Sequence, residues 1–344
     1  MSSNKTLIHC EIDFDQDGKQ TGFLRLPHSV HRSAYGWIPI PIVMFKHGEG
    51  PTTLMMAGNH GDEYEGQVAL AKLCCELDAE QIQGRLIILT MANYPAARAG
   101  LRTSPIDGGN LNRSFPGDSR GTPTQMIAHY IEDVLMPQCD YFFDFHSGGS
   151  SLDYPATALR RRGETAEMEA RLEALQIAFD APYGFIFGGF EDVRVASRAA
   201  QRKALLSIST ELGGSGTVRP DILAIGERGV KRVLHHIGML PEYVPDAARG
   251  CRMMEVQGED YYVYARDEGL FEPYVDLLAE VKAGDPAGAI HHPETPWVAP
   301  TLCHFRHHGL AICKRIPGRV ERGDCLFHVA TDMDGASGEL VFPP

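Results

Sequence analysis

The chain has 344 residues, of which 43% are hydrophobic, and its formal net charge is −13 at pH 7. This length is enough for a sizeable core and for more than one domain. The negative charge argues against nucleic acid or an anionic membrane surface as the main partner. No apolar run reaches the length of a membrane span, and the first residues lack a signal-peptide pattern, so we expect a cytoplasmic protein.

The first 45 residues alternate apolar and polar positions, which predicts short strands. Further apolar strands are predicted at 52–58, 84–94, 139–149 and 203–214. Helical periodicity is found at 65–77, 122–139, 164–179 and 221–240, with Thr122 before Pro123 as a cap. A loop rich in Gly, Asp, Asn and Pro is expected from about 95 to 123. The alternation predicts an α/β fold, a mostly parallel or mixed sheet with helices on both faces.

The character of the sequence changes near residue 245, after which short β-like runs with many Gly and Pro predominate. Two segments there, EVKAGDPAGAI (280–290) and RVERGDCLFHV (319–329), share a pattern that predicts two similar hairpin turns. We therefore expect two domains, an α/β domain at 1–245 that includes the strands of 1–45, and a small β barrel or sandwich at 246–344. The second domain would cover the mouth of the site or build a homo-oligomer.

A candidate metal site combines three side chains that follow predicted strands. His60 and Glu63 lie three residues apart in GNHGDEYEG, and His146 ends YFFDFH. Two histidines and one carboxylate are a set that zinc holds with a fourth position open, as in hydrolytic sites. The alternatives are a loop histidine, a glutamate that suits a helix N-terminus and a core histidine. We favour a metal, and Asp144, on the same strand face as His146, could orient that ring.

A second motif, NLNRSFPG, places Asn112 and Arg113 side by side on a loop. Arginine binds a planar carboxylate with two parallel hydrogen bonds, and asparagine can add a donor, so this pair is a candidate α-carboxylate site. The alternative is a solvated loop arginine. Upstream, Arg102 could polarise a scissile carbonyl beside the metal, with Arg98 as its nearby competitor.

Glu211 ends the predicted strand KALLSISTE, in the same manner as His146 ends its own. A buried carboxylate without a partner is costly, so it should have either a partner or a function. A zinc hydrolase needs a general base for the attacking water, and Glu211 fits that role. The alternative is a structural carboxylate capped by the amides of the following glycines.

The motifs HGDE, NLNRSFPG, DFHSGG and TELGGSG, in that order, resemble those of the succinylglutamate desuccinylase/aspartoacylase family, which has a zinc-carboxypeptidase-like fold. Longer stretches such as GNHGDEYEGQVAL and STELGGSGT are similar to its ectoine-degradation branch, the N-α-acetyl-L-2,4-diaminobutyrate deacetylases. The resemblance covers about residues 20–240 and continues into the β-rich region.

The resemblance implies a role for each candidate residue. His60, Glu63 and His146 would bind one zinc ion per chain. Glu211 would be the base and proton shuttle, and Arg102 would polarise the carbonyl. The remaining pair, Asn112 and Arg113, would hold the carboxylate of a small N-acyl amino acid.

The best candidate substrate is N-α-acetyl-L-2,4-diaminobutyrate, which would yield acetate and the diamino acid. The alternatives are a desuccinylase, an aspartoacylase-like enzyme or a small carboxypeptidase. A different class of function would be a non-catalytic protein that binds an amino-acid derivative. Neither nucleic acid nor a membrane is expected as a partner.

Segment 151–200 departs from that branch, although it should contribute to the wall of the pocket. Arg160, Arg161 and Arg162 could face solvent or meet an acidic acyl chain. An acetyl-diaminobutyrate pocket should instead offer an acidic group to the free amine. The candidates for that group are Asp153, Glu191 and Asp192.

Overall fold

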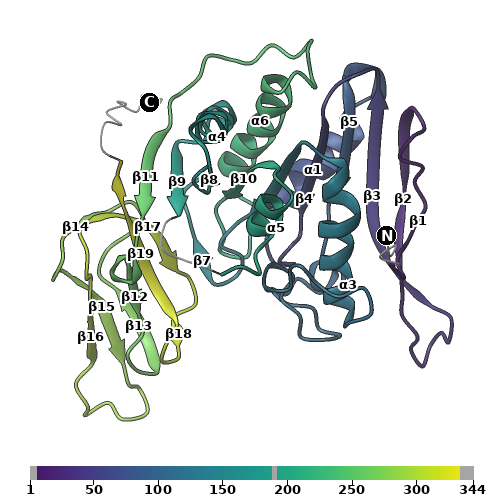
Figure 1. Ribbon diagram of the computed structural model, residues 1–344. Helices are drawn as coiled ribbons and strands as arrows, with labels where there is room; N and C mark the ends of the chain where they lie inside the picture. Colours follow the sequence, from purple (N-terminus) through teal and green to yellow (C-terminus); the bar gives the residue numbers. More distant parts are fainter. Residues whose placement is uncertain (1–5, 188–191, 334–344) are drawn as a thin grey trace.

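The computed structural model describes residues 6–187 and 192–333. Within these residues, one mixed sheet of 15 strands crosses the molecule (Figure 1). Its first ten strands are, in spatial order, β1 (His9–Cys10), β2 (Gly18–Pro27), β3 (Trp37–His47), β5 (Gly84–Leu89), β4 (Thr52–Ala57), β6 (Tyr141–His146), β10 (Leu206–Glu211), β8 (Thr157–Arg160), β9 (Tyr183–Phe187) and β11 (Arg252–Val256). The order then continues through β19 (Cys325–Asp332), β17 (Gly309–Arg315) and β14 (Glu280–Val281).

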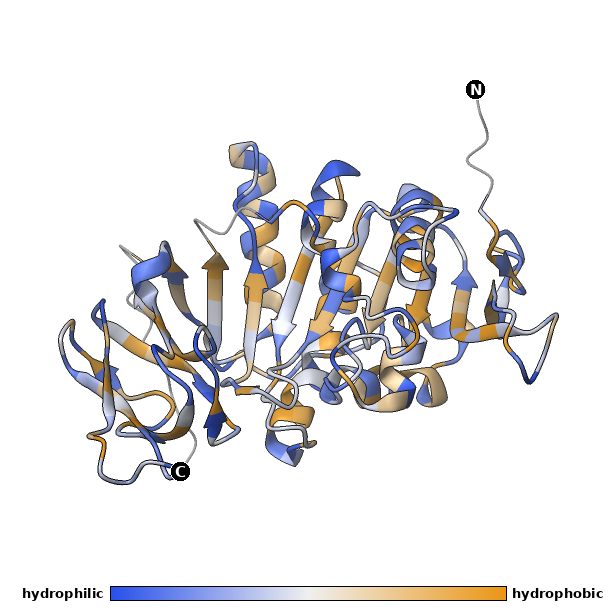
Figure 2. Ribbon diagram, turned by 90° about the horizontal axis from the view of Figure 1, so that it is seen from below, coloured by the Kyte–Doolittle hydropathy of each residue, from blue (hydrophilic) through white to orange (hydrophobic). Residues whose placement is uncertain are grey.

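Helices cover both faces of the sheet, as predicted. One face carries α1 (Glu65–Glu76), α4 (Ala166–Phe179) and α6 (Pro220–His236), whose apolar side chains share one core. The other face carries α3 (Pro123–Tyr130) and α5 (Ala196–Arg202), which contribute to a second core. Figure 2 shows the apolar residues gathered on the strands and the hydrophilic ones on the outer sides of the helices.

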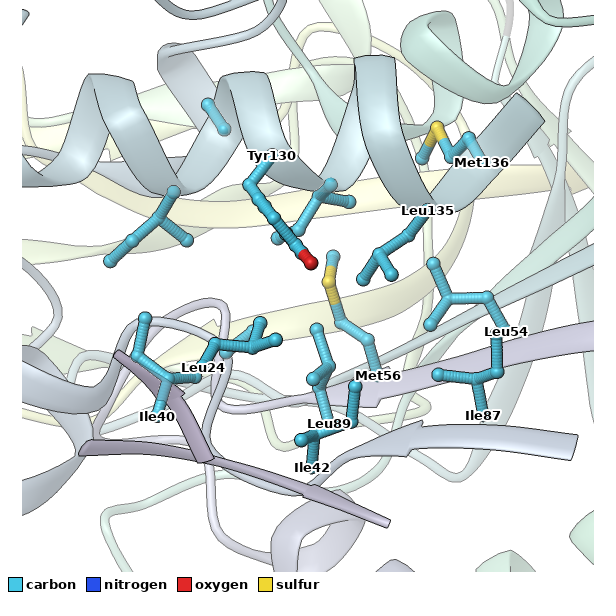
Figure 3. Packing of buried hydrophobic residues seen from close by; sticks show 14 of the residues in the cluster. Leu24, Ile40, Ile42, Leu54, Met56, Ile87, Leu89, Tyr130, Leu135 and Met136 are labelled. Carbon is cyan, nitrogen blue, oxygen red and sulfur yellow. The ribbon is translucent and has the colours of Figure 1, made fainter. Parts of the chain in front are cut away.

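Strand β4 shows why continuous apolar runs occupy the centre of this sheet. Leu54 and Met56 point into the core beneath α3, whereas Met55 and Ala57 point into the core beneath α1. Successive side chains of a strand face opposite sides, so a strand covered on both faces must be apolar throughout. Figure 3 shows Leu54 and Met56 packed among neighbours from the adjoining strands and from the helical segment that carries Tyr130.

The structure confirms the cap of α3 and corrects one loop. Thr122 accepts a hydrogen bond from the Gln125 backbone N–H, and the Gln125 side chain accepts one from the Thr122 backbone, a reciprocal capping box.

The strand predicted at 84–94 ends at Leu89. A short helix, α2 (Tyr94–Ala99), begins where a loop was expected. Its signals are a proline in the first turn and Gly100 in the left-handed region after its last turn.

The repeated pattern near the C-terminus forms two matching turns, but they are not the predicted hairpin turns, because the two strands that each turn joins belong to different sheets. The Asp285 carboxylate accepts from the Lys282 backbone N–H, and the Asp324 carboxylate accepts from the Glu321 backbone N–H, both at 2.9 Å. The strands around these turns belong to the main sheet and to a second one. The second sheet contains β16 (Thr301–His304), β15 (Pro286–His291), β13 (Gly269–Pro273) and β18 (Arg319–Val320).

The predicted division at residue 245 separates two regions that share one continuous sheet. Strand β11 lies beyond that division, yet it pairs in parallel with β9 of the first region. Strand β7 (Leu152–Asp153) makes a second link, since it pairs with β17.

Among the described residues, no helix combines the length and the apolar character needed to cross a membrane.

Candidate metal centre and active-site cavity

Three parallel strands bring the predicted site residues to one edge of the sheet. Strand β6 lies between β4 and β10, and both neighbours run parallel to it. Glu211 at the end of β10 is in register with His146 at the end of β6. His60 and Glu63 follow the end of β4. The carboxyl ends of parallel strands meet at one edge, which is where open α/β sheets bind their ligands.

Two glycines shape the turn that carries His60 and Glu63. Gly58 adopts a φ of +68°, which side chains other than glycine rarely adopt. A Cβ on Gly61 would lie 2.1 Å from the backbone carbon of Ala96, so the turn could not approach α2 with any other residue. The turn therefore directs both ligand candidates toward β6 before α1 begins.

The three candidate ligands form a buried cluster. The Nδ1 atom of His60 lies 2.6 Å from one carboxylate oxygen of Glu63, and the Nδ1 atom of His146 lies 2.8 Å from the other. One donor atom from each residue lies within 4.8 Å of the other two, so this cluster could hold a metal ion. The donor set of two imidazoles and a carboxylate suits zinc.

The outer nitrogen of each histidine has a partner that fixes its ring. His146 Nε2 lies 2.8 Å from the Asp144 carboxylate, as expected from their shared strand face, and Asn59 donates to the same oxygen. His60 Nε2 lies 3.1 Å from the Asn110 side-chain oxygen, a contact that the sequence analysis missed. Such partners select the tautomer and aim the inner nitrogen at the metal. The only signal for Asn110 was its place at the start of NLNRSFPG.

The two histidines experience different electrostatic environments. Burial lowers the pKa of His60, and its single carboxylate neighbour does not compensate. Burial also opposes protonation of His146, but the charges of Asp144 and Glu63 raise its pKa well above the ordinary value. Of the two rings, His146 is therefore the one whose protonated form is favoured by the neighbouring carboxylates.

Glu211 has the features of a proton-transferring group. Burial, together with the charge of Glu63, raises its pKa to about 8. Its Oε2 atom is buried and has no hydrogen-bond partner among the described residues.

Arg102, rather than Arg98, is the arginine that lies beside the metal-ligand cluster. Its Nη1 atom donates to Glu63 Oε1 at 3.3 Å. Arg98 is exposed and donates to the Tyr94 hydroxyl instead.

One cavity of about 310 Å³ brings all the predicted residues together. Its lining includes the seven site residues named from the sequence, which are His60, Glu63, Arg102, Asn112, Arg113, His146 and Glu211. Its floor is the shared face of β6 and β10, where Ser207 and Ser209 precede Glu211 at alternate positions. The cavity therefore leads from the metal cluster along the sheet toward α5.

The pair Asn112 and Arg113 is held in place by the first residue of α5 and by the segment that precedes it. The Asn112 side-chain oxygen accepts from the Ala196 backbone N–H at 2.9 Å, so its NH₂ group is the part of the amide that can donate to a ligand. Arg113 Nε lies 3.1 Å from the Asp192 carboxylate, and Arg113 Nη1 donates to the Asn112 carbonyl. Asp192 also pairs with Arg194, so it serves two arginines rather than an amine in the cavity.

Segment 151–200 forms part of the wall, as expected. The Arg160 side chain is buried and paired with Glu169, whereas Arg162 is exposed and pairs with Glu255. Arg161 lines the cavity and donates to the Ser197 hydroxyl at 2.9 Å. Of the acidic candidates, Asp153 is outside the lining, and Glu191 lies outside the described residues.

Comparison with known proteins agrees with this geometry. The model of the succinylglutamate desuccinylase/aspartoacylase catalytic domain matches residues 49–237. A curated N-α-acetyl-L-2,4-diaminobutyric acid deacetylase from Halomonas elongata is 41% identical over 325 residues, 94% of either chain. The chain belongs to the succinylglutamate desuccinylase/aspartoacylase family.

Solved members of the family share the whole fold. The product-bound ectoine utilization protein of Ruegeria pomeroyi is 39% identical, with a TM-score of 0.92 over 95% of this chain and 99% of its own. A succinylglutamate desuccinylase/aspartoacylase from Rhodobacter sphaeroides is 40% identical, with a TM-score of 0.90 over 95% and 99%. These similarities confirm the resemblance and the fold class predicted from the motifs.

Proposed function

We propose that this protein is a zinc-dependent amidohydrolase that removes the acetyl group from N-α-acetyl-L-2,4-diaminobutyrate. The observation that carries the proposal is one cavity in which the ligand cluster, a carboxyl whose Oε2 atom is buried without a hydrogen-bond partner among the described residues, and the side chains of Asn112 and Arg113 converge. Similarity to the diaminobutyric acid deacetylase from Halomonas elongata supports the choice of substrate. The products would be acetate and L-2,4-diaminobutyrate.

His60, Glu63 and His146 would hold the zinc ion. Their inner atoms face one another, and Asn110 and Asp144 occupy the outer nitrogens, so the rings are already aimed for coordination. When bound, zinc would lower the pKa of a water molecule, polarise the acyl carbonyl and favour the ionised form of nearby carboxyls.

Asn112 and Arg113 would dock the substrate carboxylate. The Ala196 and Asp192 contacts orient both side chains before a substrate arrives, so little ordering is lost on binding. Arg102, beside Glu63, would donate to the acyl oxygen as negative charge develops on it. Ionised Glu211 would take a proton from the attacking water and deliver it to the leaving nitrogen as the C–N bond breaks.

A second candidate substrate class is an N-acyl amino acid with a further acidic group. Arg161 favours it, because this cation lines the cavity and could meet a second acidic group. Acetate or succinate release should therefore be compared for N-α-acetyl-L-2,4-diaminobutyrate, N-succinyl-L-glutamate and N-acetyl-L-aspartate, with zinc content measured on the same preparation. Preference for the first substrate supports the proposal, and preference for either dianion supports the alternative.

A paired substitution tests the docking site. We expect Arg113→Met to raise KM for the preferred substrate about 10- to 100-fold with a smaller change in kcat, because a charge-assisted contact is lost. The matched control is Arg120→Met, a change at an exposed arginine on the following loop.

A third outcome would indicate a non-catalytic binding protein. In that case, zinc-free protein binds the substrate tightly but releases no acetate after zinc is added back.

A further inference from the structure

One side of the cavity is aromatic and is built by both regions of the chain. We call this set the aromatic wall, and its members are Tyr154, Phe187, Tyr262 and Tyr264. Tyr154 follows β7 and Phe187 ends β9, whereas the other two tyrosines form the ends of β12 (Tyr262–Tyr264). Figure 1 shows β12 among the C-terminal strands, to one side of β9.

The alternation along β12 determines which side chains reach the cavity. Tyr262 and Tyr264 are two residues apart, so they share one face, and their rings stack with centroids 5.9 Å apart and an interplanar angle of 14°. Val263 points the other way into the core of the C-terminal strands. Pairing of β12 with β19 fixes this orientation. The cavity therefore meets two parallel phenol rings.

Charge is distributed unevenly over the rest of the lining. Four arginines line the cavity, which are Arg102, Arg113, Arg160 and Arg161. The acidic residues of the lining, Glu63, Asp144 and Glu211, all belong to the metal centre or face it. Asp153 and Asp192 do not reach the cavity. A cationic group on a substrate thus finds no acidic side chain outside the metal centre, within the part of the chain that the structure describes.

The group behind the wall adds no positive charge. His328 packs against the wall, with its ring centroid 5.0 Å from that of Tyr262 and 5.3 Å from that of Tyr154. It shares a 2.9 Å hydrogen bond with the Tyr154 hydroxyl. Burial lowers the pKa of His328 to about 3, so the ring is neutral at physiological pH. The faces of the wall therefore keep the negative potential that attracts cations.

We propose that the aromatic wall binds the side-chain ammonium of the substrate by cation–π contact and so selects a diamino acid over its uncharged analogues. The inference rests on the proposed function, because it assigns the amine end of the same substrate. The carboxylate would lie with Asn112 and Arg113, and the arginines of the lining repel an ammonium, so we assign this group to the aromatic wall, whose ring faces attract cations. Tyr262 and Tyr264 are specificity-determining residues in this arrangement.

The test compares two substrates that differ in one charged group. N-α-acetyl-L-2,4-diaminobutyrate ends in an ammonium, and N-α-acetyl-L-norvaline places a methyl group of similar size there. The measured quantity is the ratio of their kcat/KM values. We expect Tyr264→Leu to lower this ratio about tenfold and Tyr264→Phe to preserve it, since the phenyl face keeps the cation–π contact without the hydroxyl.

Tyr264 is partly exposed at 44%, so its replacement spares the core. The control is Tyr274→Leu, an exposed tyrosine of the same region that does not line the cavity, and it should leave the ratio unchanged. An equal loss for both substrates in Tyr264→Leu would show that the wall provides shape alone and would overturn the inference.

Binding measured by calorimetry separates this inference from the proposed function. The wild-type protein and Tyr264→Leu are titrated with L-2,4-diaminobutyrate and with L-norvaline. Tighter wild-type binding of the diamino acid, lost in Tyr264→Leu, supports the aromatic wall even if neither acetylated substrate is hydrolysed. Equal affinities for the two amino acids would overturn it even if acetate is released.

Discussion

The Nε2 atom of His60 faces the neutral amide oxygen of Asn110 at 3.1 Å, whereas Nε2 of His146 faces the Asp144 carboxylate at 2.8 Å. Both partners aim a ring at the same centre, but only one carries charge. A carboxylate partner raises the basicity of a ligand ring more than an amide does. The two histidines should therefore contribute unequally to metal binding.

Loss of the neutral partner should weaken metal binding without removing a ligand. We expect Asn110→Ala to lower zinc affinity about tenfold, because His60 loses the contact that fixes its tautomer. Asp144→Asn should lower it further, since Asp144 also holds Asn59 and carries charge. Zinc affinity is measured by competition with a chelator. Arg120→Ala, a change at an exposed residue of the following loop, is the control, and a loss there equal to that of Asn110→Ala would contradict the prediction.

Replacement of the proposed proton carrier should abolish turnover and spare the fold. Glutamine mimics the protonated form of Glu211, which burial already favours, so Glu211→Gln should keep its zinc and its unfolding temperature. Turnover should fall about 10²- to 10⁴-fold. The matched control is Glu65→Gln, because Glu65 is another buried carboxyl, with its pKa raised to about 7 by burial, and it lies outside the cavity lining. Near-normal rates in Glu211→Gln would remove this residue as the base.

The two neighbouring arginines provide a direct comparison. Arg102→Met should lower kcat/KM about 10²-fold or more, because the cavity loses a donor aimed at the developing negative charge. Zinc content should stay unchanged. Arg98→Met should have little effect, since Arg98 is exposed and contacts Tyr94. Steady-state kinetics on both variants decides the assignment, and equal losses would show that neither arginine is specific to the reaction.

Acid should destabilise the fold through His328. Its pKa is about 3 in the folded chain and 6.5 in the unfolded one, so the unfolded chain takes up the proton first. The free energy of unfolding should therefore fall as the pH drops from about 6.5 toward 3, by up to about 1.4 kcal/mol per pH unit from this group. Urea unfolding at a series of pH values measures the slope.

Removal of the titrating ring should reduce that slope. In His328→Gln, the free energy of unfolding should depend less on pH than in the wild type over the same range. His308→Gln, a change at an exposed histidine, should leave the slope as it is. Identical slopes in wild type and His328→Gln would mean that other groups cause the acid sensitivity.

The strands and ligands of the site could be predicted because their signals are local. A spacing of three residues after an apolar run places His60 and Glu63 together through one glycine turn, and His146 needs only the end of its own strand. The helix α2 was missed because its six residues, YPAARA, carry too weak an apolar period to be distinguished from a loop.

Contacts between distant segments could not be predicted in this way. Asn110 meets His60 across 50 positions of sequence because the loop that follows α2 returns to the site. The aromatic wall depends on the pairing of β12 with β19, which no local pattern specifies. The sequence indicated that the C-terminal region could cover the mouth of the site, but it did not indicate that Tyr262 and Tyr264 line the cavity.

Strand β19 lies near the end of the chain, yet it pairs with β11, β12 and β17. During synthesis, the growing chain must therefore carry an unfinished sheet edge at β11 until Cys325–Asp332 has left the ribosome. Unpaired strand edges invite association with other chains. Completion of the sheet and of the aromatic wall thus waits for β19, so the substrate pocket can form only after this strand has been synthesised.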